Sequence, residues 1–188
     1  MWFRRDLRTH DHPALTHAIT DAAGAPVLPL FIVIPGSWPR LGPPARAYVA
    51  DSLAALRGQL GSLHVRTGDP AEVLAGLARE LGPLTVHVTE AHTPRGRQRD
   101  ADVAAALTAT GSRLLARGSN YAVPPGTVRK PDGSPYRVFT PLHRAWLEEG
   151  RPPPGGPARP GTMLDLAGDP LPLAAPPEGS SLPPAGEQ

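Results

Sequence analysis

The hydrophobic positions of the chain alternate between short continuous runs and helical stripes. Residues 26–34 (PVLPLFIVI) form an almost unbroken apolar run between Gly24 and Pro35. Such a run is typical of a strand buried on both faces of a parallel sheet. Trp2-Phe3-Arg4 is interpreted as the end of a first strand whose beginning is missing. Shorter strands are predicted at residues 63–66, 84–89 and 113–116.

Between these runs, apolar residues recur every three to four positions, as they do on one face of a helix. Residues typical of helix N-termini accompany these stripes. Asp69-Pro70 and Thr93-Pro94 each place an N-cap acceptor before a proline, and Asp11 or His12 is the N-cap candidate before Pro13. The stripes comprise Ala14, Leu15, Ala18, Ile19 and Ala22; Val49, Leu53, Leu56 and Leu60; and Val73, Leu74, Leu77, Ala78 and Leu81.

The order strand, helix, strand, continued to a fifth strand, requires parallel strands joined by right-handed crossovers. We therefore predict an α/β fold over residues 1–150, a Rossmann-like, doubly wound five-stranded parallel sheet flanked by helices. A short helix is expected over residues 140–149. The chain has 26 prolines and 20 glycines, and their density is highest after residue 150, so residues 151–188 are predicted to form a Pro/Gly-rich linker or disordered tail.

Composition narrows the classes of protein. The 188 residues suit one domain, and the absence of cysteine excludes disulfides and thiolate chemistry. No apolar run approaches the length of about 18 residues that spans a membrane, and the N-terminus is no signal peptide, so a cytoplasmic protein is expected. The net charge is +2, and Lys130 is the sole lysine among 19 cations. This arginine usage reflects either codon bias or an anionic partner.

Ligands of an open α/β sheet bind at the carboxyl ends of the strands. No GxGxxG follows a strand and no P-loop occurs, so neither a dinucleotide site nor a P-loop is predicted. Arg95, Arg97 and Arg99 follow the fourth strand; they form either a solvated face or, with the helix N-terminus, a site for an anionic group. The spacing of the seven histidines matches no zinc motif, and no serine lies in a nucleophile elbow.

Residues 2–15 (WFRRDLRTHDHPAL) resemble the WFRRDLRxxDNxAL block that opens DNA photolyases and cryptochromes. Four more blocks follow in the order of that family. They are residues 27–35 (VLPLFIVIP), 68–70 (GDP), 93–100 (TPRGRQRD) and 136–146 (YRVFTPLHRAW). Residues 1 to about 150 are thus similar to the N-terminal α/β domain of the photolyase/cryptochrome family.

The resemblance implies a domain that binds a light-harvesting antenna pigment. In the family, excitation passes to a reduced FAD in a separate helical domain, which repairs pyrimidine dimers in DNA. The chain ends before that domain, so the resemblance implies no bound FAD, no catalytic residue, and weak or no DNA binding by this chain alone. Its expected partner is a separately encoded FAD-binding photolyase domain.

The resemblance also favours one pigment class. Folate-binding members carry an Asn-Glu pair where this chain has Arg95-Gly96, so methenyltetrahydrofolate is disfavoured. Residues 94–100 and 44–48 are similar to members that bind 8-hydroxy-5-deazaflavin or FMN, although Ala91 replaces a common aspartate and Arg95 a common tyrosine. The candidate cofactor-binding residues are Arg5, Asp6, Ile34, Trp38, Arg46, Glu90, Arg95, Gly96 and Arg99. No metal site is predicted.

Two alternatives stay open. The same sheet edge could serve a stand-alone nucleotide- or flavin-binding module unconnected to light. The chain could also be a non-functional photolyase fragment, because its first strand is clipped and its linker leads nowhere. A buried strand without its first half would expose core surface at about 25 cal/mol per Å², so either the true start lies upstream or the domain is marginally stable.

Overall fold

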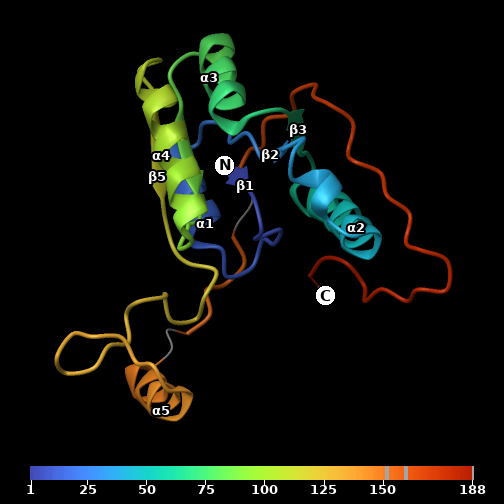
Figure 1. Cartoon of the computed structure of the whole chain (residues 1–188). Helices are drawn as coiled ribbons and strands as arrows, with labels where there is room; N and C mark the ends of the chain where they lie inside the picture. Colours follow the sequence, from blue (N-terminus) through green and yellow to red (C-terminus); the bar gives the residue numbers. More distant parts are fainter. Residues whose placement is uncertain (151–152, 159–160, 188) are drawn as a thin grey trace.

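The computed structural model describes residues 1–150, 153–158 and 161–187. Strands and helices alternate along the chain as predicted (Figure 1). In order, they are β1 (Trp2–Phe3), α1 (Pro13–Ala22), β2 (Leu30–Val33), the 3-10 helix η1 (Trp38–Arg40), α2 (Pro43–Leu60), β3 (His64–Thr67), α3 (Pro70–Leu81), β4 (Thr85–Val88), α4 (Pro94–Thr108), β5 (Arg113–Ala116) and α5 (Phe139–Glu149).

The five strands of the α/β fold are all parallel to the strands they pair with. β2 lies between β1 and β3, with Trp2 opposite Leu30 and Phe31 opposite Val65. β4 and β5 form a second ladder. β1 also contacts β4, which gives the spatial order β3-β2-β1-β4-β5. The hydrogen-bonded ladder is interrupted between β1 and β4, because β1 has only two residues and forms a regular ladder with β2 alone.

The strands bury side chains on both faces, as the continuous apolar runs predict. Phe3 and Phe31 belong to a core formed with α1 and α2. Trp2 and Leu30 belong to a second core formed with α3 and α4. Trp2 and Phe3 are only 2% and 0% exposed, on opposite faces of the same short strand. The doubly wound arrangement therefore follows from alternation along each strand.

Three helix starts use the predicted caps. The Asp69 carboxylate accepts hydrogen bonds from the backbone N–H groups of Ala71 and Glu72, and Thr93 Oγ1 accepts one from Gly96 N. For α1, the acceptor is His12 Nδ1, which receives Leu15 N at 3.2 Å. These caps satisfy N–H groups that have no partner within the helix.

The chain after β5 is packed differently. Turns lead to α5, which begins one residue before the predicted helix, contains no buried residue and lies apart from the α/β body (Figure 1). The tail, drawn from orange to red, then returns along β3 and past α2. Its described residues are extended and bonded to the body: Val27 N donates to Thr162 O, and Asp169 N to Val65 O.

The predicted boundary at residue 150 stays a prediction. Residues 151–152, 159–160 and 188 of the predicted tail lie outside the described residues. Within the described ranges, no helix combines the length and apolar character required to cross a membrane.

Candidate functional site at the carboxyl ends of the strands

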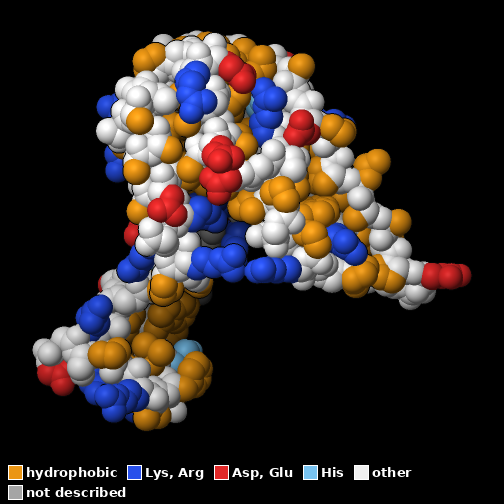
Figure 2. Space-filling view, turned by 45° about the horizontal axis from the view of Figure 1, so that its top comes forward, with side chains coloured by type: hydrophobic (Ala, Val, Ile, Leu, Met, Phe, Trp, Pro, Cys, Tyr) orange, Lys and Arg blue, Asp and Glu red, His pale blue; other side chains and the backbone are white. Residues whose placement is uncertain are grey.

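A cavity of about 650 Å³ opens at the carboxyl ends of β1 and β2, where open α/β sheets bind ligands. Figure 2 shows a hollow on this side of the molecule with cationic side chains along its rim, and the cations that line the cavity are all arginines. The cavity lies between the β1–α1 loop, α2 and α4. Its lining residues are Trp2, Phe3, Arg4, Arg5, Asp6, Leu7, Arg8, Phe31, Ile32, Val33, Ile34, Ser37, Trp38, Leu41, Tyr48, Val49, Ser52, Arg99, Gly186 and Glu187.

The β1–α1 loop is held by the buried carboxylate of Asp6. One oxygen accepts Arg4 N at 3.0 Å, and the other accepts the Thr89 hydroxyl and lies 3.2 Å from His12 Nε2. Because His12 Nδ1 already accepts Leu15 N, the ring proton belongs on Nε2, facing Asp6. Burial raises the pKa of Asp6, but His12 and Thr89 outweigh it, and the pKa lies below its usual value. The Asp6 carboxylate therefore contacts the protein interior and fixes the conformation of the loop.

Two guanidinium groups flank the indole of Trp2 at the base of the cavity. Those of Arg4 and Arg99 lie 5.0 and 5.3 Å from the ring centroid, within cation–π range. Asp100 accepts hydrogen bonds from both arginines, and Arg4 also donates to Thr89 O. Burial raises the pKa of Asp100 above its usual value, and the nearby Arg99 guanidinium offsets part of this rise. This cluster fixes Arg99 at the cavity wall.

The cavity wall combines apolar side chains with arginine side chains. Ile34, Trp38 and Val49 contribute carbon surface, and all three are half-buried. Arg5 is exposed and has no hydrogen-bond or ion-pair partner among the described residues. The Arg8 guanidinium is tied back to the carbonyl of Asp11 at 2.8 Å, close to the same rim. An apolar wall with a few placed polar groups is the usual character of a small-molecule site, and the free cation favours an anionic group.

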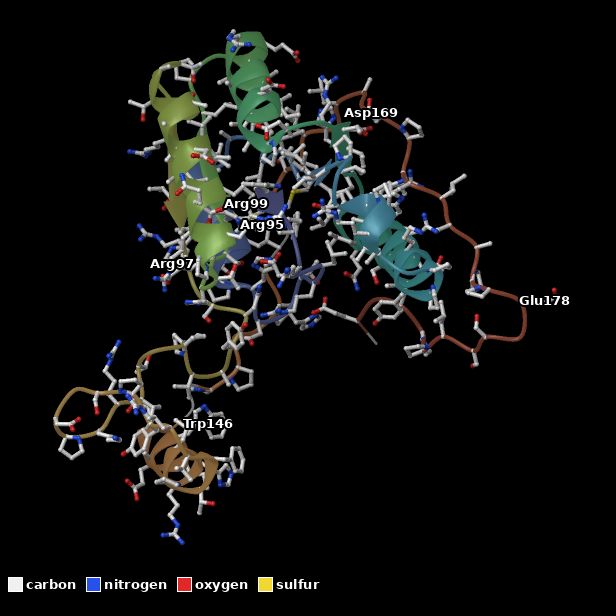
Figure 3. The ribbon with its side chains drawn as sticks, viewed as in Figure 1. Arg95, Arg97, Arg99, Trp146, Asp169 and Glu178 are labelled. Carbon is white, nitrogen blue, oxygen red and sulfur yellow. The ribbon has the colours of Figure 1, made fainter. Side chains whose placement is uncertain are left out.

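The three arginines of α4 do not act together. Figure 3 shows Arg97 on the opposite side of the helix from Arg95 and Arg99. Arg95 and Arg97 are exposed, and only Arg99 lines the cavity. Helical geometry explains the position of Arg97, because successive residues are rotated by about 100° around the axis. Arg95 shares the face of Arg99 but stays exposed and outside the cavity.

Gly96 has a packing role. A Cβ at this position would lie 2.9 Å from both Ala91 Cβ and Thr93 Oγ1, so no side chain fits without a shift. Its backbone N–H completes the Thr93 cap at 3.1 Å. Gly96 thus lets the β4–α4 loop lie against the first turn of α4. Neither Gly96 nor Ala91 lines the cavity.

The predicted candidates divide into two groups. Arg5, Asp6, Ile34, Trp38 and Arg99 all line the cavity. Arg46, on the first turn of α2, Glu90, exposed after β4, Arg95 and Gly96 do not. A binding role for each of these residues stays a prediction.

Several residues that line the cavity were not among the predicted candidates. Tyr48 and Ser52 share one face of α2 and reach the cavity. Their spacing of four residues is the signal that marks one helix face, and it could have favoured Tyr48 over Arg46. Gly186 and Glu187 come from the far end of the chain, and no local pattern points to them. In the described part of the chain, no three His, Asp or Glu side chains are placed to hold a metal ion.

Fold and cavity together define a Rossmann-like α/β domain with a crevice at the carboxyl edge of the sheet. Comparison with known proteins gives its family. The model of the DNA photolyase family matches residues 1–160. The chain therefore belongs to the DNA photolyase family, of which it carries the N-terminal, antenna-chromophore α/β domain.

Individual relatives agree with this assignment. The deoxyribodipyrimidine photo-lyase of Halobacterium salinarum is 36% identical over 89% of this chain, and the matched region is 37% of that protein. A class III photolyase from Agrobacterium tumefaciens, 28% identical, matches 90% of this chain and 36% of its own with a TM-score of 0.75. A photolyase from Sulfolobus tokodaii shares the fold at a TM-score of 0.75 and 23% identity, over 88% of this chain and 37% of its own. The chain spans about 37% of the curated relatives it matches.

Proposed function

We propose that this chain binds a planar pigment with an anionic group in the crevice and serves as a light-harvesting antenna. One observation carries the proposal: a cavity of about 650 Å³ joins an apolar wall to the unpaired cation of Arg5 at the ligand-binding edge of the sheet. This volume lies within the range of about 300–1,000 Å³ that is usual for small-molecule sites. We infer that Ile34 and Trp38 contact the pigment ring and that Arg5 pairs with its negative charge.

8-Hydroxy-5-deazaflavin or FMN fits this chemistry better than methenyltetrahydrofolate. Arg95-Gly96 stands where folate-binding members carry Asn-Glu, and Gly96 is too closely packed to accept a side chain. The Sulfolobus tokodaii photolyase holds two FAD molecules, with the implication of a novel light-harvesting cofactor. A second flavin, with an implied light-harvesting role, is thus described for one protein with this fold.

Repair chemistry lies outside the proposal for this chain alone. Its relatives are named photo-lyases, and this chain spans about 37% of their length. We propose that a FAD-binding photolyase domain, encoded separately or beyond these residues, acts on the DNA and receives the excitation. We expect weak or no DNA binding by the α/β domain alone. A cytoplasmic location belongs to the same proposal.

The test is pigment binding by the purified chain. FMN, 8-hydroxy-5-deazaflavin and methenyltetrahydrofolate are titrated separately, and binding is followed by pigment fluorescence; ATP tests the alternative of a plain nucleotide module. We expect the two flavin-type pigments to bind. Arg5→Ala should weaken FMN binding by about tenfold, equivalent to about 1.4 kcal/mol for a charge-assisted contact. Arg97→Ala, which removes an exposed arginine away from the cavity, is the matched control.

The outcomes separate the hypotheses. Binding of ATP without any pigment would favour the stand-alone nucleotide module. A chain that unfolds cooperatively yet binds no pigment would overturn the antenna proposal. A chain without a cooperative unfolding transition would support the view that it is a non-functional fragment.

A further inference from the structure

The end of the tail closes one side of the crevice. Gly186 and Glu187 line the cavity, although nearly the whole chain separates Glu187 from the residues of the β1–α1 loop to which it is hydrogen-bonded. The tail reaches this position along an anchored path: Leu164 N donates to Val27 O at 2.9 Å, and Asp169 N donates to Val65 O at 2.8 Å. Its last described residues are thus delivered to the rim of the crevice.

The Glu187 carboxylate accepts hydrogen bonds from a cluster of donors in the β1–α1 loop. One oxygen accepts Thr9 N at 2.7 Å and Thr9 Oγ1 at 2.8 Å, and lies 3.2 Å from His10 Nδ1. The other accepts His10 N at 2.8 Å. These contacts lower the pKa of Glu187 to about 2 against the opposing effect of burial. The carboxylate is therefore ionised and held throughout the neutral range.

The donor set suits a phosphate as well as it suits a carboxylate. Two consecutive backbone N–H groups that converge on one anion form a concave site of the kind that binds phosphate in many proteins. Here they are joined by a hydroxyl and an imidazole, and Arg5 and Arg8 of the same loop line the adjoining cavity. Glu187 is the anion that fills this site in the structure.

Backbone packing fixes Gly186 beside α2. Its φ of +86° lies in the left-handed region that favours glycine. A Cβ on Gly186 would lie 2.8 Å from the Cβ of Ala55. The tail end is thus seated against the helix by a close approach that only glycine allows.

We propose that the Thr9-His10 turn is an anion site for a phosphate monoester, and that the chain's own Glu187 competes with the ligand for it. The proposal rests on the proposed function in one respect: the phosphate of FMN is taken as the natural occupant, with the ring in the adjoining crevice. A pigment with a phosphate displaces Glu187 and releases the tail end from the β1–α1 loop. A pigment without one binds beside the docked tail.

The first experiment compares FMN with riboflavin, which has the same ring system and no phosphate, in flavin-fluorescence titrations of the full chain. Glu187→Ala should strengthen FMN binding by about tenfold and change riboflavin binding by less than about twofold. Glu178→Ala is the matched control, because Glu178 projects from the same tail without a partner among the described residues (Figure 3). It should change neither affinity.

A second variant separates the anion site from the tail. Thr9→Val removes the hydroxyl donor and keeps the shape of the side chain. In the Glu187→Ala background it should weaken FMN binding about threefold to tenfold and leave riboflavin binding unchanged. Equal FMN affinity of the wild type and Glu187→Ala, with both folded, would overturn the competition.

A third measurement does not depend on flavin binding. Inorganic phosphate is titrated against labelled wild type and Glu187→Ala while the amide signals of Thr9 and His10 are followed by NMR. These signals should move at about tenfold lower phosphate concentration in Glu187→Ala. If no flavin binds but this difference is found, the pigment proposal fails and the anion site stands. If phosphate leaves both amides unmoved in Glu187→Ala, the anion site is refuted whatever flavin does.

Discussion

The β1–α1 loop and the start of α4 flank the same crevice, and each carries three arginines within five residues. In the loop all three line the cavity, whereas in α4 only one does. The loop presents all three side chains to the cavity. In α4 the rotation of about 100° per residue turns Arg97 to the opposite side, and Arg95 is exposed outside the cavity on the same side as Arg99. Similar sequence patterns therefore make different surfaces, and the backbone decides which. The residues compared are Arg4, Arg5 and Arg8 with Arg95, Arg97 and Arg99.

The two regions also differ in what holds them. The loop is organised by one buried carboxylate, Asp6, which accepts hydrogen bonds from Arg4 N and from the hydroxyl of Thr89, the residue after β4, and lies 3.2 Å from His12 Nε2 at the cap of α1. The start of α4 is organised by the absence of a side chain at Gly96. The loop therefore depends on polar pairing and the helix start on close packing.

The largest effect is expected from Asp6→Ala. The substitution leaves the Thr89 hydroxyl buried without its acceptor and removes the carboxylate that lies 3.2 Å from His12 Nε2. Breaking a buried pair of this kind costs about 3–5 kcal/mol. The free energy of unfolding should fall by that amount in urea denaturation. Asp102→Ala is the control, because Asp102 is exposed on α4 and, among the described residues, is hydrogen-bonded by its side chain to Gln98 alone. A loss below about 1 kcal/mol for Asp6→Ala would contradict the view that this carboxylate organises the loop.

A smaller effect is expected at the other region. Gly96→Ala would place a methyl group 2.9 Å from Ala91 Cβ and Thr93 Oγ1, and overpacking of this kind costs about 1–3 kcal/mol. Gly76→Ala, in the middle of α3, meets nothing within 4 Å. It should stabilise the protein by about 0.5–1 kcal/mol, because alanine is the better helix former. Thermal unfolding of the two variants should therefore shift in opposite directions. A shift in the same direction would show that Gly96 is not closely packed.

The sequence predicted the features that depend on neighbours in the chain. Periodicity located all five strands and the main helices, and the caps at Asp69 and Thr93 are as expected. The rule that ligands bind at the carboxyl ends of strands pointed to the exits of the first four strands, and the cavity lies at those of β1 and β2. The interruption between β1 and β4 was not predicted, because it depends on how few residues β1 contributes to pairing.

Features that depend on distant contacts could not be predicted. Glu187 and Thr9 are 178 residues apart, and nothing in a Pro/Gly-rich tail indicates where its end lies. The inward role of Asp6 depends on the Thr89 hydroxyl, which a different strand brings within reach. Arg95 was selected by its place in a motif, while its exposure is set by the direction in which α4 presents that face.

The smallest expected effect is a difference in pKa between one carboxylate of each region, Asp6 in the loop and Asp100 in α4. The pKa of Asp6 lies below the ordinary value of 3.8, because His12 and Thr89 outweigh the effect of burial. The pKa of Asp100 lies above it, because burial outweighs Arg99. Asp6 therefore contributes stability that is present above pH 3.8 and lost as the pH falls through its folded pKa. Asp100 acts oppositely: its contribution is present below pH 3.8 and lost as the pH rises through its folded pKa.

Carboxyl NMR titration tests this opposition directly. The midpoint of Asp6 should lie below 3.8 and that of Asp100 above it. Arg99→Gln should raise the Asp100 midpoint further, since it removes the guanidinium that favours the charged carboxylate, and should leave Asp6 where it is. A shift of both midpoints by the one substitution would show that the loop and the start of α4 are electrostatically coupled through Arg4, which bonds to Asp100 by its side chain and to Asp6 by its backbone N–H. Unchanged titration of Asp6 would establish that its pairing with His12 and Thr89 isolates the loop from the charges on α4.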